Sequence, residues 1–145
     1  MRVFLFVRSD CPITNRYAPE LQRIAKDFQA QGVAFWLVYP DKSENASSIS
    51  SHIAQYGFPG KPLRDPGSIL VKRAEVTVAP EAAVFDSTGK LVYHGRIDDL
   101  WVDIGKSRPT ATTHDLEDAI TAVLEGRAPV HPETRAVGCS LADLE

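Results

Sequence analysis

The sequence predicts a protein of the α/β class, a three-layer α/β/α sandwich in which helices cover both faces of a central mixed sheet. Two continuous apolar segments, residues 3–7 and 33–39, have the composition of strands that are buried on both faces. A helical pattern lies between them, so a right-handed crossover should make these strands parallel. Two further short apolar segments flank the turn at residues 86–89 and predict an antiparallel hairpin.

The first helix is expected to begin directly after Cys11. Ser9 or Asp10 can cap it, and Pro12 suits a first turn, where its missing N–H would be unpaired in any case. Apolar residues then recur every three or four positions and form one inward face: Ile13, Tyr17, Leu21, Ile24, Ala25 and Phe28.

The remaining elements follow from the same kinds of pattern. In chain order we expect a polar helix at 44–56, a loop at 57–66, a short helix at 67–74, strands at 82–85 and 90–94, a loop at 98–112 and a last helix at 113–125. Beyond residue 126 there are two prolines and no periodicity. The sequence therefore predicts one domain over residues 1–126 and a C-terminal tail, residues 127–145, which carries Cys139.

Composition excludes several classes of partner. The chain has 145 residues, of which 43% are hydrophobic and 24% charged, as in an ordinary globular domain. Its formal net charge is −3, with no block of lysine or arginine, so we expect no nucleic-acid partner. No apolar run approaches the roughly 20 residues of a membrane-spanning helix. The sequence gives no indication of the oligomeric state.

The beginning of the chain allows two interpretations of its compartment. The apolar run at residues 3–7 is too short for a signal peptide, which predicts a cytoplasmic protein for the chain as written. A core strand that begins at about residue 2 instead suggests that an N-terminal segment is missing, and an export signal in that segment would make the protein extracytoplasmic (periplasmic).

Cys11 and Cys139 are the only cysteines, which excludes a disulfide framework and a four-cysteine zinc site. The two thiols could form one long-range bridge, serve separate roles or be inert. The histidines, at positions 52, 94, 114 and 131, have no metal-ligand spacing. We therefore predict no metal site and no cofactor.

Four local features, in their order along the chain, resemble the thioredoxin superfamily, in particular the thioredoxin-like and redoxin branch related to peroxiredoxins. Cys11 ends the first strand and opens a helix. It begins the motif C-P-I-T, which matches the C-x-x-C box of that family with Thr14 in the last place. Pro19 stands where thioredoxins carry a helix-kinking proline, and Pro80 stands where they carry a cis-proline before the hairpin. The resemblance covers about residues 2–125 and implies the thioredoxin fold.

Two departures from the family matter for function. The second cysteine of the box is absent, so no local disulfide can form. Arg8 stands three residues before Cys11, where peroxiredoxins place threonine or serine, so the peroxidase signature is incomplete.

The resemblance implies that Cys11 is the reactive thiol. A thiol attacks as the thiolate, and a free cysteine has a pKa of about 8.5. Unpaired N–H groups and the macrodipole at a helix N-terminus lower that value. The Thr14 hydroxyl, one turn further on, can donate a hydrogen bond to the thiolate. If the tail folds back, Cys139 can resolve a mixed disulfide or a sulfenic acid at Cys11.

The same resemblance implies where a substrate binds. An X-Pro bond is almost the only kind of peptide bond that adopts the cis form. In the family, the backbone beside the cis-proline pairs with an incoming extended chain, a role that falls to Val78 and Ala79, while Pro80 keeps the site open. Pro12, next to Cys11, belongs to the same contact surface. The partners implied are protein or small-molecule thiols and disulfides.

Three functional hypotheses follow. The first is a thiol–disulfide oxidoreductase that uses the single helix-N-terminal cysteine Cys11 and is resolved by Cys139 or by an external thiol. The second is a one-cysteine, peroxiredoxin-like peroxidase. The third is a non-catalytic binding module with a thioredoxin fold.

Overall fold

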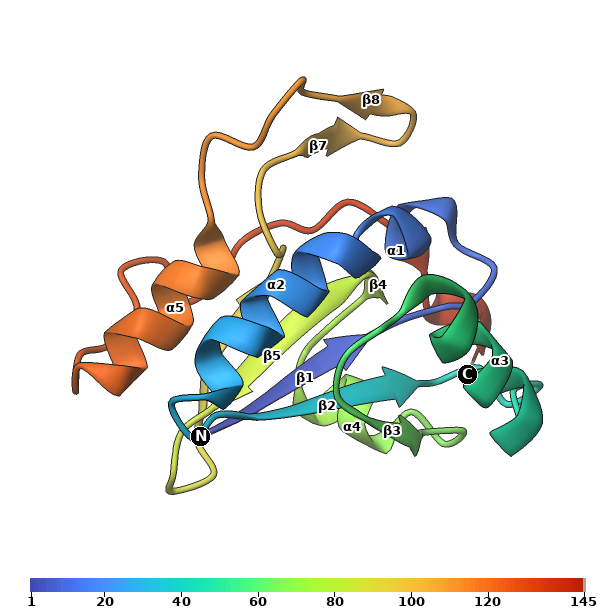
Figure 1. Ribbon diagram of the computed structural model, residues 1–145, viewed down its shortest axis with the longest axis horizontal. Helices are drawn as coiled ribbons and strands as arrows, with labels where there is room; N and C mark the ends of the chain where they lie inside the picture. The colour runs from blue at the N-terminus through green and yellow to red at the C-terminus, as the bar shows by residue number, and fades with distance from the viewer. Residues whose placement is uncertain (145) are drawn as a thin grey trace.

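A mixed five-stranded sheet forms the centre of the computed structural model, which describes residues 1–144 (Figure 1). The strand order is β3-β2-β1-β5-β6. As predicted, β1 (Arg2–Phe6) runs parallel to β2 (Ala34–Tyr39), and β2 is also parallel to β3 (Lys61–Arg64). On its other side β1 pairs antiparallel with β5 (Glu81–Phe85), which forms the predicted hairpin with β6 (Leu91–Gly95).

Side chains alternate across the sheet and build two cores. Val3 and Leu5 of β1 point into the larger core, which is covered by α2 (Ala18–Gln29), α3 (Ala46–Tyr56) and α5 (Asp115–Leu124). Figure 1 shows α2 and α5 in front of the sheet.

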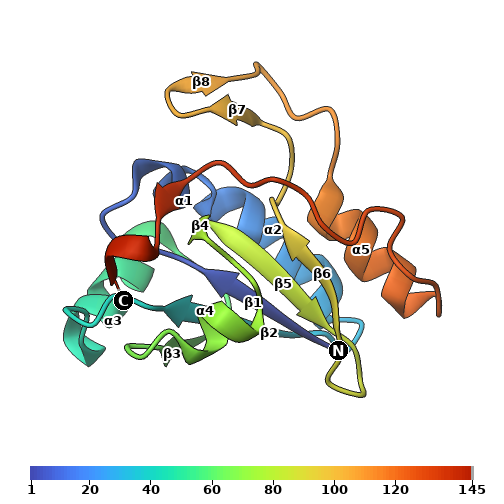
Figure 2. The same ribbon diagram turned by 180° about the vertical axis from the view of Figure 1, so that it is seen from behind.

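Phe6 of β1 points into the second core, on the opposite face. There α4 (Ile69–Arg73) packs on the sheet beside the 3-10 turn η1 (Ala142–Leu144), which comes from the C-terminal tail (Figure 2). The layers therefore match the predicted sandwich, but the tail supplies part of one of them.

The first predicted helix is divided into two. α1 (Pro12–Arg16) ends at Tyr17, and α2 begins at Ala18. Pro19 has no N–H to donate to the carbonyl of Asn15, and its ring crowds that carbonyl. The proline thus separates the turn beneath Cys11 from the long helix that packs on the sheet.

Two segments that were expected to be loops contain strands. Residues 57–66 include β3, a short edge strand that contains Pro62, and proline in a sheet is confined to such edges. Residues 98–112 include the small hairpin of β7 (Trp101–Asp103) and β8 (Lys106–Ser107). Strands this short leave no periodic pattern in a sequence.

The C-terminal tail folds back along the edge of β6. The His94 N–H donates to the Pro132 carbonyl at 3.0 Å, and the Thr134 N–H donates to the His94 carbonyl at 3.2 Å. Gly95 permits this approach, because a Cβ there would lie 2.6 Å from the Thr134 carbonyl oxygen. The predicted boundary at residue 126 stays a prediction. None of the helices within residues 1–144 combines the length and hydropathy that crossing a bilayer requires.

Candidate active site

Cys11 lies between β1 and the first helical turn, as the sequence predicts. It is the N-cap of α1, with extended backbone angles (φ −97°, ψ 115°), and its carbonyl accepts the first helical hydrogen bond from the Asn15 N–H at 3.1 Å. Pro12 occupies the first helical position and is exposed. Cys11 itself is completely buried, with 0% exposure. No external molecule can touch this residue in the conformation described.

A disulfide joins Cys11 to Cys139, with Cα atoms 6.0 Å apart and 128 positions between them in the sequence. Of the alternatives left open by the sequence, the structure thus contains the long-range bridge. The expected mechanism with Cys11 as the single helix-N-terminal cysteine is not confirmed, because a cysteine pair exists. Thr14 does occupy the last place of the C-x-x-C box, and the partner comes from the tail instead.

The peptide bond between Ala79 and Pro80 is cis. It follows the short strand β4 (Val78–Ala79), which pairs antiparallel with β9 (Cys139–Ser140) of the tail. The Cys11 sulfur lies 3.4 Å from the Ala79 carbonyl oxygen. A disulfide sulfur carries no hydrogen, so this is a contact in the oxidised protein, and it becomes available as a hydrogen bond when the thiol forms. The structure therefore brings Cys11, Cys139, Ala79 and Pro80 together.

Thr14 is fully buried one turn from Cys11, and its hydroxyl has no hydrogen-bond partner among residues 1–144. An unpaired buried hydroxyl costs about 1–3 kcal/mol. Its donor is thus free for a new acceptor that forms inside the site.

Arg8 binds the C-terminal tail and Asp10. Its guanidinium donates to the Ser140 carbonyl at 2.6 Å and forms ion pairs with Asp10 and Asp143, both at 3.0 Å. The hydrogen bond from Arg8 lowers the pKa of Asp10. The residue at the peroxiredoxin threonine position therefore holds the tail in this chain.

Glu81 is a site residue that the sequence analysis missed. It follows Pro80 directly, is only 5% exposed, and accepts hydrogen bonds from the N–H groups of Thr77 (3.1 Å) and Val78 (3.3 Å). Burial raises the pKa of Glu81, while these two hydrogen bonds oppose the rise. Its carboxylate fixes the backbone that leads into the cis-proline. An acidic residue at the start of an otherwise apolar strand was the signal available in the sequence.

His52 is a buried histidine beside the site. It is 5% exposed, with Nδ1 2.7 Å from the Tyr39 hydroxyl and Nε2 2.6 Å from Asn15 Oδ1. Burial lowers the pKa of His52, which favours the neutral ring. Asn15 in turn donates to the Ser9 carbonyl at 3.1 Å, so this network ties α1 to the loop before Cys11.

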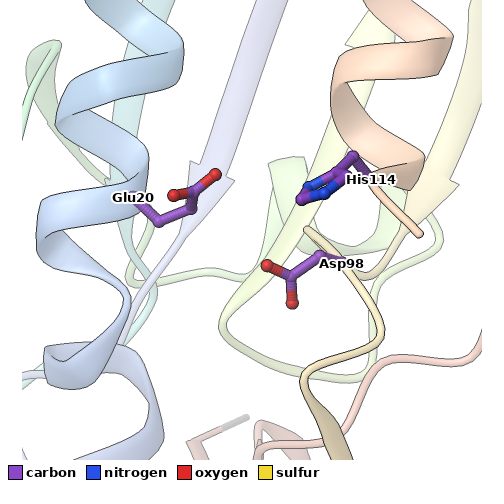
Figure 3. Close-up of side chains that lie close together, drawn as sticks. All are labelled: Glu20, Asp98 and His114. Carbon is purple, nitrogen blue, oxygen red and sulfur yellow. The ribbon is translucent and has the colours of Figure 1, made fainter. Parts of the chain in front are cut away.

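Among the described residues, Glu20, Asp98 and His114 place one potential metal-ligand atom each within 4.8 Å of one another (Figure 3). Asp98 is buried, and its Oδ1 accepts hydrogen bonds from the Tyr17 hydroxyl and the Leu100 N–H. Both Glu20 oxygens accept hydrogen bonds from Arg23. Both carboxylates thus already accept hydrogen bonds from other protein groups. The absence of a metal stays a prediction.

Solved structures similar to this chain have related folds. An uncharacterized conserved protein from Geobacillus kaustophilus is 26% identical, with a TM-score of 0.79, and the match covers 96% of this chain and 75% of the other. A hypothetical protein from Sinorhizobium meliloti is 23% identical, with a TM-score of 0.77, and the match covers 96% of this chain and 77% of the other.

A secreted disulfide oxidoreductase from Mycobacterium tuberculosis, homologous to E. coli DsbE, is 19% identical, with a TM-score of 0.55, and the match covers 86% of this chain and 80% of the other. These likenesses confirm the predicted thioredoxin fold. No curated protein matches the chain. The profile of the AhpC/TSA family matches residues 1–94, which include Cys11, the cis-proline and the central strands. The chain thus belongs to the AhpC/TSA family, and its fold is the thioredoxin-like redoxin fold.

Proposed function

We propose that the protein is a thiol–disulfide oxidoreductase in which Cys11 is the nucleophile and Cys139 is the resolving cysteine. The observation that supports this most directly is the bridge between these two residues, located beside the cis peptide of Pro80. A bridge between these two sulfurs is the state in which one turn of thiol–disulfide exchange leaves the protein. The disulfide oxidoreductase among the structural neighbours agrees with this chemistry at the level of the fold.

The cycle begins from the reduced protein. The Cys11 thiolate attacks a partner disulfide, and one partner sulfur leaves as a thiolate. The Cys139 thiolate then attacks the mixed disulfide at Cys11, which releases the second partner thiol and closes the bridge. The free hydroxyl of Thr14 supplies a donor for the Cys11 thiolate, and Val78 and Ala79 supply the backbone edge on which a partner docks. We assign Pro12, the residue after Cys11, and Pro80, the residue after Ala79, to the surface that contacts the partner.

The test measures the pKa of the Cys11 thiol and the rate at which the protein reduces disulfides. In Cys139→Ser, the rate at which Cys11 is alkylated should titrate with a pKa below the value of about 8.5 for free cysteine. Wild type should reduce insulin or glutathione disulfide, Cys11→Ser should be inactive, and Cys139→Ser should accumulate a mixed disulfide. A Cys11 pKa at or above the free value contradicts the proposal.

The family match also makes peroxide reduction a candidate. In that reaction peroxide oxidises the Cys11 thiolate to a sulfenic acid. The Cys139 thiol can then condense with the sulfenic acid, release water and form the same bridge. Arg8 argues against it, because its guanidinium is bound to the tail where peroxiredoxins place a hydroxyl residue. Peroxide added to Cys139→Ser distinguishes the two reactions, since thiol–disulfide exchange predicts no rapid sulfenic acid at Cys11 by mass spectrometry.

A further inference from the structure

The tail occupies the docking edge beside the cis-proline. β9 pairs with β4 so that Ala79 faces Cys139 and Val78 faces Ser140. One residue further on, the Leu141 N–H donates to the Thr77 carbonyl at 3.0 Å. The N–H and C=O groups along one edge of a strand can pair with only one other strand at a time. A partner therefore cannot use this edge until the tail has left it.

We infer that residues 137–141 are a built-in copy of the partner: the β4 edge binds an extended polypeptide whose cysteine follows a glycine and precedes, by two positions, a large apolar residue. The inference rests on the proposed thiol–disulfide exchange and adds the class of substrate to it. The seated tail shows which side chains the edge accepts on either side of the bonded sulfur.

The position before the cysteine accepts only glycine. Gly138 is buried, and a Cβ at this position would lie 2.6 Å from the Ala79 carbonyl carbon and 3.1 Å from the Pro80 nitrogen. Both neighbours are backbone atoms of the segment held by Glu81, so they cannot rotate away as a side chain would. Any side chain here would push the cysteine away from Cys11.

The second position after the cysteine accepts a large apolar side chain. Leu141 is 3% exposed and lies in the second core, together with Phe6, Val38 and Val71. Ser140, between the two, is exposed, as alternation along a strand requires. The edge thus distinguishes partners at the positions of Gly138 and Leu141 and tolerates variation at the position of Ser140.

Arg8 adds a contact that does not depend on the partner's side chains. Its hydrogen bond goes to the backbone carbonyl of Ser140, which every polypeptide has. The ion pair with Asp143 is specific to the tail and is solvent-accessible. When a partner strand replaces the tail on β4, the Arg8 guanidinium can therefore donate to a backbone carbonyl of the partner instead.

This exchange orders the proposed cycle. With the tail displaced, the Cys11 thiolate attacks the docked partner's disulfide, a Cys11–partner bond forms, and the other partner sulfur leaves with the electron pair and takes a proton from water. When the tail returns to β4, it displaces the partner strand, and the Cys139 thiolate attacks the Cys11 sulfur. The partner leaves as a thiol and the Cys11–Cys139 bond forms, so the two electrons gained by the partner come from the two cysteines.

The test uses the full chain with Cys139→Ser, in which Cys11 is the only thiol. The probes are two peptides, Ala-Val-Gly-Cys-Ser-Leu-Ala and its counterpart with alanine in place of glycine, each activated as a mixed disulfide with thionitrobenzoate. Release of thionitrobenzoate measures transfer of the peptide to Cys11. The reaction of each peptide with free glutathione gives its intrinsic reactivity. The reaction of Cys11 with the small reagent dithiobis(nitrobenzoate) gives the reactivity of the thiol when no peptide docks.

The glycine peptide should react with Cys11 about tenfold faster than the alanine peptide, or more. A tenfold rate ratio corresponds to a difference of about 1.4 kcal/mol in activation free energy. Both peptides should react alike with glutathione. Adding Gly138→Ala to the same chain should accelerate the reaction of the glycine peptide, because the competing tail no longer binds to β4. Leu141→Ser is a second substitution that should weaken the binding of the tail to β4.

Equal rates for the two peptides, with normal reaction of the small reagent, overturn the docking inference and leave the proposed function intact. No reaction of Cys11 with the small reagent, even in the chain with Gly138→Ala, overturns the proposed function itself. Because the peptide comparison needs no substitution at Gly138, the inference remains testable if Gly138→Ala does not fold.

Discussion

At the scale of single residues, the site depends on polar groups that are buried with few partners. Thr14 has no exposure and no hydrogen-bond partner within residues 1–144. The sequence identifies its position, because it replaces the second cysteine of the box. It does not reveal that the hydroxyl is unpaired, since this depends on every neighbour that packs around α1.

Thr14→Val tests the role of this hydroxyl, because valine keeps the branched shape and removes the donor. We expect the oxidised protein to gain stability, up to the cost of about 1–3 kcal/mol of an unpaired buried hydroxyl. In the reduced protein the Cys11 pKa should rise by about one unit or less, since the thiolate loses a donor. Thermal melts and alkylation against pH measure the two effects. Thr14→Ser is the control, and an unchanged Cys11 pKa in the valine variant contradicts the assignment.

At the scale of elements, the segment from Thr77 to Glu81 carries the proposed docking edge. β4 is only two residues long, so its geometry depends on Glu81, which binds the N–H groups before the cis peptide. The resemblance to thioredoxins, which carry a cis-proline before the hairpin, was enough to predict the cis bond at Pro80. The buried carboxylate that holds this bend was not predicted, because a single acidic residue in a short strand usually points to solvent.

Glu81 should make stability depend on pH. Burial raises its pKa in the folded state, so the stability it contributes is complete below its ordinary unfolded pKa and is lost as the pH rises through the folded value. Glu81→Gln keeps an acceptor oxygen without the charge. We expect the melting temperature of wild type to fall more than that of the variant as the pH rises above the ordinary glutamate pKa of about 4.3.

The matched control is Glu125→Gln, at an exposed carboxylate, whose pH profile should follow wild type. Parallel profiles for wild type and Glu81→Gln contradict the raised pKa.

At the scale of the whole molecule, the tail connects distant parts of the chain. It pairs with the edge of β6, pairs with β4, inserts Leu141 and Leu144 into the second core, and is joined to Cys11 by the disulfide. Arg8 contacts Ser140 across 132 positions of sequence. The oxidised fold is therefore closed into one large covalent loop.

Reduction should destabilise the protein strongly. In the chain-entropy model a bridge that closes a loop of this size contributes about 4–5 kcal/mol. Denaturant unfolding with and without dithiothreitol measures the difference. Cys139→Ser should unfold at the reduced midpoint under both conditions and is the control. If oxidised and reduced wild type unfold at the same midpoint, the bridge does not restrict the unfolded chain as the model assumes.

The sequence by itself determined the layers of the fold and predicted the two segments, around Cys11 and Pro80, that form the candidate site. Continuous apolar strands, the helical spacing after Cys11 and the hairpin turn are local patterns, and burial of each apolar face leaves few ways to assemble them. The motif at residues 11–14 and Pro80 likewise mark the site locally. Edge strands as short as β3 escaped detection because they contain too few residues for a pattern.

Only the tertiary structure decided where the tail lies and which sulfur faces Cys11. Tail docking depends on backbone pairing with β4 and β6, on Arg8 reaching a carbonyl far along the chain, and on Gly95 and Gly138 lying where two backbones approach closely. Backbone hydrogen bonds are the same for every residue type, so a segment held mainly by them leaves no periodic signal in its sequence. Its position follows from the surface that the rest of the chain has already built.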